Sequence, residues 1–170
     1  VLIYWPALVD SKHINEVVHF NGKSKELKPT SQLNFEEIYY QTEPVKIPDA
    51  PKGETSHVPL GTLFGARSGD KGGCANLGVW AKDLDAFAFL SSFLTIKKLK
   101  ELMPDLKGFK IERFDRPNIL SLNFYIHDIL EDGVSSNSRK DAQAKSLGEY
   151  FRAKKANIPS SLLETLNEYG

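Results

Sequence analysis

The chain has 170 residues, of which 41% are hydrophobic and 26% charged, and its formal net charge is zero. These values are typical of a soluble globular domain, and without a basic surplus we expect no nucleic acid partner. No apolar run approaches the ~20 residues that cross a bilayer, so we expect no membrane association. The single cysteine, Cys74, excludes an internal disulfide and a cysteine-based structural zinc site. We therefore expect no metal, no cofactor and a cytoplasmic location.

The first third of the chain differs from the rest. Apolar residues 1–9 predict a buried strand, and residues 17–20 predict a second strand that enters a tight turn at Asn21-Gly22. Four prolines within residues 42–59 indicate an extended linker, which places a boundary near residue 55. Because the chain begins at Val1 rather than Met, we expect it to be a part of a larger protein, which leaves targeting to an organelle open.

The remainder has the periodicity of a folded domain. Its alternating and helical patterns predict elements in the following order: strands 58–66 and 76–81, a helix 84–94, a short helix 96–103 capped by Thr95, strands 109–114 and 119–126, a helix from Asp141 to about residue 154, and a terminal helix 160–169. Strand-strand-helix thus occurs twice. We expect an α+β fold, a two-layer α/β sandwich with helices on one face of a four-stranded, mainly antiparallel sheet. Aromatic residues expected in its core are Trp80, Phe87, Phe89, Phe93 and Phe124.

A glycine-rich stretch, residues 67–73, lies between the first two of these strands, and we expect it to be a loop. Arg67 and Lys71 flank Gly69 within it, and backbone N–H groups in such turns bind anions. We predict that this stretch binds a carboxylate or phosphate ligand. The predicted ligand-binding residues are Arg67, Ser68, Gly69, Asp70, Lys71 and Gly72. The alternative is a salt bridge from Asp70 to either cation that only fixes the turn. Two neighbouring cations argue against Asp70 as a general base.

Other polar residues leave their roles open. Asn76 and Asn123 are further candidates for ligand binding, because asparagine inside a strand is usually there for hydrogen bonding; Asn123 would orient a carbonyl or tie down the loop. Asp141 and Lys145 are four apart, which predicts a helix cap and a helical ion pair, or an extension of the basic site by Lys145. We assign no catalytic residue, and no role to Cys74 or His127.

Several unusual strings resemble a known family. These strings are residues 66–72, 75–80, 94–95, 113–117, 122–124, 133–134 and 141–145. With this spacing, residues from about 58 to 163 resemble the C-terminal domain of the acyclic terpene utilisation protein AtuA family. The resemblance covers about two thirds of the chain.

The resemblance implies a ferredoxin-like fold for residues 58–170, and residues 1–57 as the connector or tail of a larger N-terminal domain. It implies a link to the breakdown of acyclic terpenes such as citronellol and geraniol through branched acyl-CoA intermediates, but no particular chemical step. The expected ligand is a CoA thioester or a carboxylate. The expected partner is the rest of a larger AtuA-like polypeptide. Whether the chain is part of an enzyme stays open. The alternative is a non-catalytic assembly module that binds that polypeptide or forms a homo-oligomer.

Overall fold

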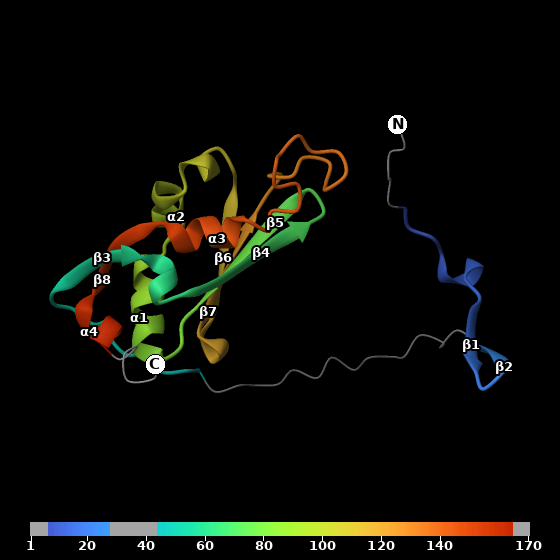
Figure 1. Cartoon of the computed structure of the whole chain (residues 1–170), viewed down its shortest axis with the longest axis horizontal. Coiled ribbons are helices and arrows are strands. Elements are labelled where there is room, and N and C mark those ends of the chain that lie inside the picture. The colour runs from blue at the N-terminus through green and yellow to red at the C-terminus, as the bar shows by residue number, and fades with distance from the viewer. Residues whose placement is uncertain (1–6, 28–43, 165–170) are drawn as a thin grey trace. The chain divides into compact units, whose positions relative to one another are not determined.

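The computed structural model describes residues 7–27 and 44–164, and the chain divides between Glu43 and Pro44 into two compact units (Figure 1). The first unit holds a 3-10 turn, Ser11–His13, and a hairpin of β1, Glu16–Phe20, and β2, Lys23–Leu27. The predicted turn at Asn21-Gly22 is confirmed: φ is 49° and 70°, as two-residue hairpin turns require.

The predicted N-terminal strand is wrong where it can be judged. Residues 7–9 form no strand, and Leu8 and Val9 are exposed, while residues 1–6 lie outside the described part of the chain. Hydrophobic composition alone therefore does not bury residues 7–9.

The second unit is built on a four-stranded antiparallel sheet with the order β4-β5-β7-β6. The strands are β4, Gly65–Lys71; β5, Cys74–Trp80; β6, Ile111–Arg116; and β7, Ser121–Ile126. Alternate residues of β5 and β7 are buried, among them Leu77, Val79 and Phe124, and they pack into one core with the helices. The helices lie on this face of the sheet (Figure 1). The predicted α+β sandwich and its repeated strand-strand-helix order are confirmed.

The helices are α1, Leu84–Phe93; α2, Ile96–Leu102; α3, Leu147–Ala153; and α4, Ser160–Glu164. Side-chain caps start the first two, since Asp83 accepts the N–H of Ala86 at 2.8 Å and Thr95 accepts that of Lys98 at 3.1 Å. The Thr95 cap is as predicted. Residues 165–169 of the predicted terminal helix lie outside the described residues. In the described ranges, no helix has the length and apolar character needed to span a membrane.

One predicted strand is wrong, and one strand was not predicted. The single strand predicted at 58–66 is instead β3, Thr55–Pro59, a 3-10 turn, Leu60–Thr62, and the start of β4. Its partner β8, Lys155–Pro159, was not predicted at all, and the two form a separate antiparallel pair. This pairing joins segments about 100 residues apart, which no local pattern reveals.

The helix predicted from Asp141 begins only at Leu147. The Asp141 carboxylate accepts the backbone N–H groups of Lys145 at 3.0 Å and Ser146 at 2.9 Å, and Ala144 takes a left-handed φ of 53°. A left-handed residue cannot continue a right-handed helix, so the segment is a capped turn. The predicted Asp141–Lys145 contact is therefore made through the Lys145 backbone.

The core contains most of the aromatics predicted for it. Phe87 and Phe124 are fully buried, and Phe89 and Phe93 pack against the core while partly exposed. Trp80 was predicted wrongly, because its side chain is 43% exposed. It lies on the face of the sheet opposite the helices, since it alternates with the buried Val79 on β5.

Candidate functional site

The stretch predicted as a loop is mostly strand. Residues 67–71 belong to β4, and only Gly72 and Gly73 form the turn into β5. Since side chains alternate along a strand, Arg67, Gly69 and Lys71 lie on one face of the sheet, and Ser68 and Asp70 on the other. The predicted ligand residues are therefore divided between two faces, with Gly72 in the turn.

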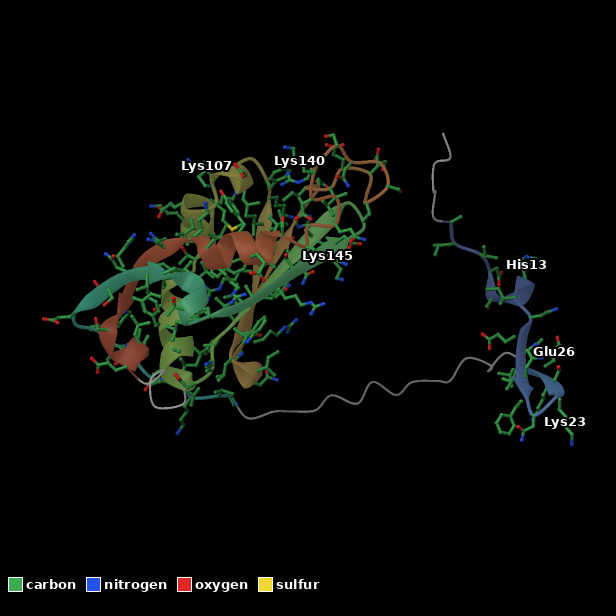
Figure 2. All side chains as sticks on the ribbon, viewed as in Figure 1. His13, Lys23, Glu26, Lys107, Lys140 and Lys145 are labelled. Atoms are coloured by element: carbon green, nitrogen blue, oxygen red, sulfur yellow. The ribbon has the colours of Figure 1, made fainter. Side chains whose placement is uncertain are left out.

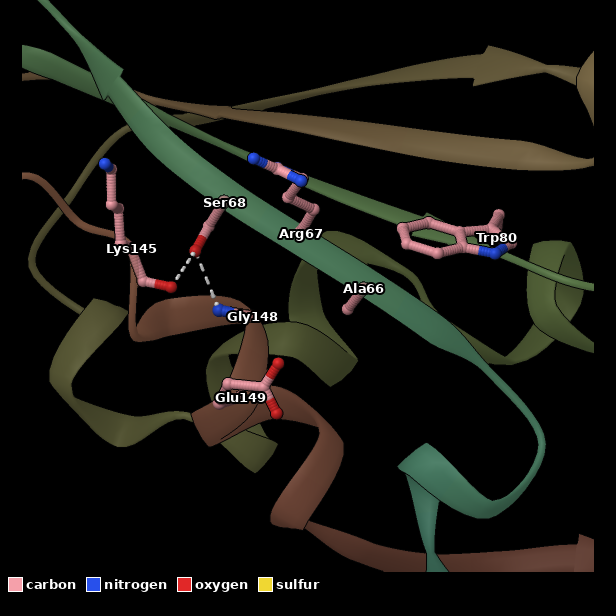
Figure 3. Close-up of a pocket in the computed structure, with 7 residues that line it drawn as sticks. All are labelled: Ala66, Arg67, Ser68, Trp80, Lys145, Gly148 and Glu149. Carbon is pink, nitrogen blue, oxygen red and sulfur yellow. Dashed lines mark hydrogen bonds between the residues drawn. The ribbon is translucent and has the colours of Figure 1, made fainter.

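Ser68 connects β4 to the start of α3. Its Oγ accepts the backbone N–H of Gly148 at 2.8 Å and donates to the carbonyl oxygen of Lys145 at 3.1 Å (Figure 3). Ser146, which precedes α3, makes no side-chain cap of its own, so Ser68 supplies that cap from a distant strand. Gly148 is needed for this approach, because a Cβ there would lie 3.2 Å from the Cα of Arg67.

A groove of about 310 Å³ runs beside this contact, along the edge of β4 (Figure 3). Arg67 and Lys145 both line it, and both side chains are exposed. Neither forms an ion pair within the described ranges 7–27 and 44–164. The other lining residues are Ala66, Ser68, Trp80, Gly148 and Glu149. The structure thus places Lys145 in the lining of the same groove as Arg67.

Glu149 is the one carboxylate that lines the groove, and it is already paired. Its Oε2 lies 3.0 Å from Nη1 of Arg152, one turn further along α3. Figure 3 shows Ser68 between the Arg67 and Lys145 side chains, and both cationic ends directed away from Glu149. The groove therefore presents two positive groups without an opposing negative one.

The remaining residues of the stretch lie elsewhere. Lys71 is exposed at the far end of β4, opposite Cys74, and Asp70 is on the other face. Among the described residues, Asp70 forms an ion pair with neither Arg67 nor Lys71, so the salt bridge considered as an alternative is not formed.

Asn76 and Asn123 meet on the face of the sheet that carries Trp80. Nδ2 of Asn76 donates to Oδ1 of Asn123 at 3.3 Å, across the β5–β7 pair. This bond links two central strands and is not a bond to residues 67–73, which was the tying role considered for Asn123. Gly78, opposite Asn123, has no side chain, and a Cβ there would lie 4.0 Å from Oδ1 of Asn123.

Glu112, Tyr125 and His127 form a cluster at one end of this face. The Nε2 atom of His127 lies 2.6 Å from Oε1 of Glu112, and the ring of Tyr125 meets His127 edge-on at 4.9 Å. The hydrogen bond from His127, reinforced by Lys110, lowers the pKa of Glu112 below its usual value. A hydrogen bond with Cys74, together with burial, raises the pKa of the Tyr125 phenol. His127 is therefore held by a carboxylate.

The residues that the structure describes form no recognisable catalytic or metal centre. No three His, Cys, Asp or Glu side chains among residues 7–27 and 44–164 converge to hold a metal ion. The serine–histidine contact between His19 and Ser24, at 2.7 Å, joins two exposed cross-strand neighbours of the β1–β2 hairpin. The groove is the site that the geometry favours.

The fold defines a ferredoxin-like domain, a two-layer α+β sandwich with a cationic groove at one sheet edge. The family model of the AtuA ferredoxin-like domain matches residues 58–156, which is more than half of the chain, and the chain belongs to this family. No curated protein and no solved structure gives a significant match. The matched span contains the whole four-stranded sheet and the groove residues Arg67, Trp80 and Lys145.

Proposed function

We propose that residues 58–170 are the ligand-binding domain of a larger AtuA-like polypeptide, which residues 1–57 connect to its upstream part. The polypeptide acts in acyclic terpenoid or branched acyl-CoA catabolism, and the groove holds a carboxylate or a phosphate of a CoA thioester. One observation carries the proposal: Arg67 and Lys145 line the same groove, and its only carboxylate, Glu149, is paired with Arg152.

The two cations suit such a ligand in different ways. The planar guanidinium of Arg67 offers two parallel hydrogen bonds to a carboxylate or phosphate, while the Lys145 ammonium adds a point charge. Each charge-assisted bond contributes roughly 1.5–3 kcal/mol. A larger ligand would bind more tightly through its remaining contacts.

Calorimetric titration tests the proposal. CoA and branched acyl-CoA thioesters should release heat with the intact chain, and Arg67→Ala or Lys145→Ala should weaken binding about tenfold or more. Lys97→Ala is the matched control, because Lys97 is an exposed lysine of α2 outside the groove. If no CoA compound binds, or if all three variants bind as the unmodified chain does, the groove is not the site.

A second candidate is a non-catalytic assembly module, which the sheet face opposite the helices favours. Phe114 on β6 is 40% exposed and shares that face with Trp80. Exposed aromatics of this kind are common at the centre of protein interfaces. Light scattering on Phe114→Ser and Arg67→Ala separates the candidates: loss of oligomers in Phe114→Ser, with ligand binding unchanged, favours assembly.

A further inference from the structure

We infer that the ligand of the groove is a nucleotide, whose base stacks on the indole of Trp80 while its phosphate is held by Arg67 and Lys145. The inference rests on the proposed anion-binding function of the same groove, and it adds the chemical class of the ligand. Trp80 is the residue that carries it, because the two cations by themselves would accept any small anion.

The indole of Trp80 lies against the backbone of Gly65. The two residues are direct partners in the β4–β5 ladder. A Cβ on Gly65 would fall 2.1, 2.3 and 2.5 Å from three indole atoms, Cε2, Cζ2 and Nε1, so the ring passes directly over this glycine. One side of the ring is therefore supported by the strand, and the side chain is still 43% exposed.

Such an arrangement suits base stacking. A fixed aromatic ring with an accessible π-face stacks on any nucleobase, with a contribution of about 1–3 kcal/mol per base. Arg67, on the neighbouring strand and in the same groove, is placed to hold the attached phosphate. The groove volume of about 310 Å³ is at the lower end of the range of small-molecule sites, which suits one nucleotide.

The neutral charge of the chain favours a free nucleotide over a polynucleotide. A nucleic acid strand is bound mainly through a basic surplus, and this chain has 22 basic and 22 acidic residues. Two local cations are enough for the phosphates of one nucleotide.

Tryptophan fluorescence tests the inference and needs one background substitution. The chain has two tryptophans, Trp5 and Trp80, so a Trp5→Phe background leaves Trp80 as the only reporter. The probes are AMP, ribose 5-phosphate and inorganic phosphate, each titrated by fluorescence and by calorimetry. AMP should quench Trp80 and bind about 5- to 150-fold more tightly than ribose 5-phosphate, which carries the same single phosphate and lacks the base.

Two variants complete the test. Trp80→Leu should bind ribose 5-phosphate as before and lose the preference for AMP, whereas Phe114→Leu, which changes another exposed aromatic of the same sheet, should keep it. Circular dichroism confirms that both variants are folded. Equal binding of AMP and ribose 5-phosphate, or AMP binding without quenching, overturns the inference and leaves the anion site intact. If none of the three probes binds, the proposed function fails with it.

Discussion

The Ser68 hydroxyl and the Gly148 N–H, which are 80 positions apart in the chain, are joined by a hydrogen bond of 2.8 Å. The same hydroxyl donates to the Lys145 carbonyl, so one side chain holds both the start of α3 and the residue that carries a groove cation. The geometry of the groove therefore depends on Ser68, whose hydroxyl already forms hydrogen bonds with two backbone groups.

Ser68→Ala should lower the free energy of unfolding by about 1–2 kcal/mol, because the N–H of Gly148 loses its cap. Urea denaturation measures this. Ser92→Ala is the control, since Ser92 is exposed and its hydroxyl donates to Phe89 of its own helix; it should change stability by less than about 0.5 kcal/mol. Equal effects of the two substitutions would show that the long-range bond contributes nothing.

Gly73→Ala should be strongly destabilising, by about 2–4 kcal/mol, because the new Cβ would lie 2.2 Å from the backbone oxygen of Glu131. Backbone cannot move aside as a flexible side chain can. Gly69→Ala, four residues earlier, is the comparison, since its nearest neighbour would be 3.9 Å away. Gly69→Ala should have the melting temperature of the unmodified chain. A stable Gly73→Ala protein would contradict this hairpin geometry.

Trp80 and Phe124 should respond differently to truncation. Phe124→Ala should cost about 3–5 kcal/mol, because Phe124 is fully buried in the core. Trp80→Leu should cost about 1 kcal/mol or less, since the indole is partly exposed and packs mainly on Gly65. Chemical denaturation compares them, and a larger loss at Trp80 would place that residue in the core after all.

Glu112 should make the free energy of unfolding depend on pH in the acid range. Its pKa is lowered in the folded chain by the hydrogen bond from His127, so as pH falls below about 4.5, its ordinary value, the unfolded chain takes up the proton first. The stabilisation is therefore present above this pH and is lost as pH falls through the lowered pKa. Melting temperatures from pH 7 to 3 should show a smaller loss in Glu112→Gln and in His127→Ala. Parallel acid profiles for all three proteins would exclude this contribution.

Local patterns predicted the parts of the fold that local physics controls. The Asn21-Gly22 turn, the Thr95 cap and the alternation of Leu122 and Phe124 each depend on neighbours within a few residues, and the structure confirms them. The alternation does not extend back to Leu120, whose left-handed φ of 50° ends a 3-10 turn before β7 begins. Such a reversal leaves no trace in hydrophobic periodicity.

Long-range contacts account for most of the wrong predictions. Glycines and charges at residues 67–71 suggest a loop, but pairing with β5 makes them a strand. One wrong prediction has a local cause, since the sequence Ala-Gln-Ala-Lys at residues 142–145 suggests a helix and the Asp141 carboxylate closes a turn instead. The groove itself depends on the contact between Ser68 and Lys145, 77 positions apart, so Arg67 was predicted while the position of Trp80 was not.

Nuclear magnetic resonance titration of the ¹⁵N-labelled chain with CoA tests the central claim most directly. The account predicts concentration-dependent shifts of the backbone N–H signals of Arg67, Ser68 and Gly148, and their loss in the double variant Arg67→Ala, Lys145→Ala. Absence of shifts at these three residues, or the same shifts in the double variant, would contradict it.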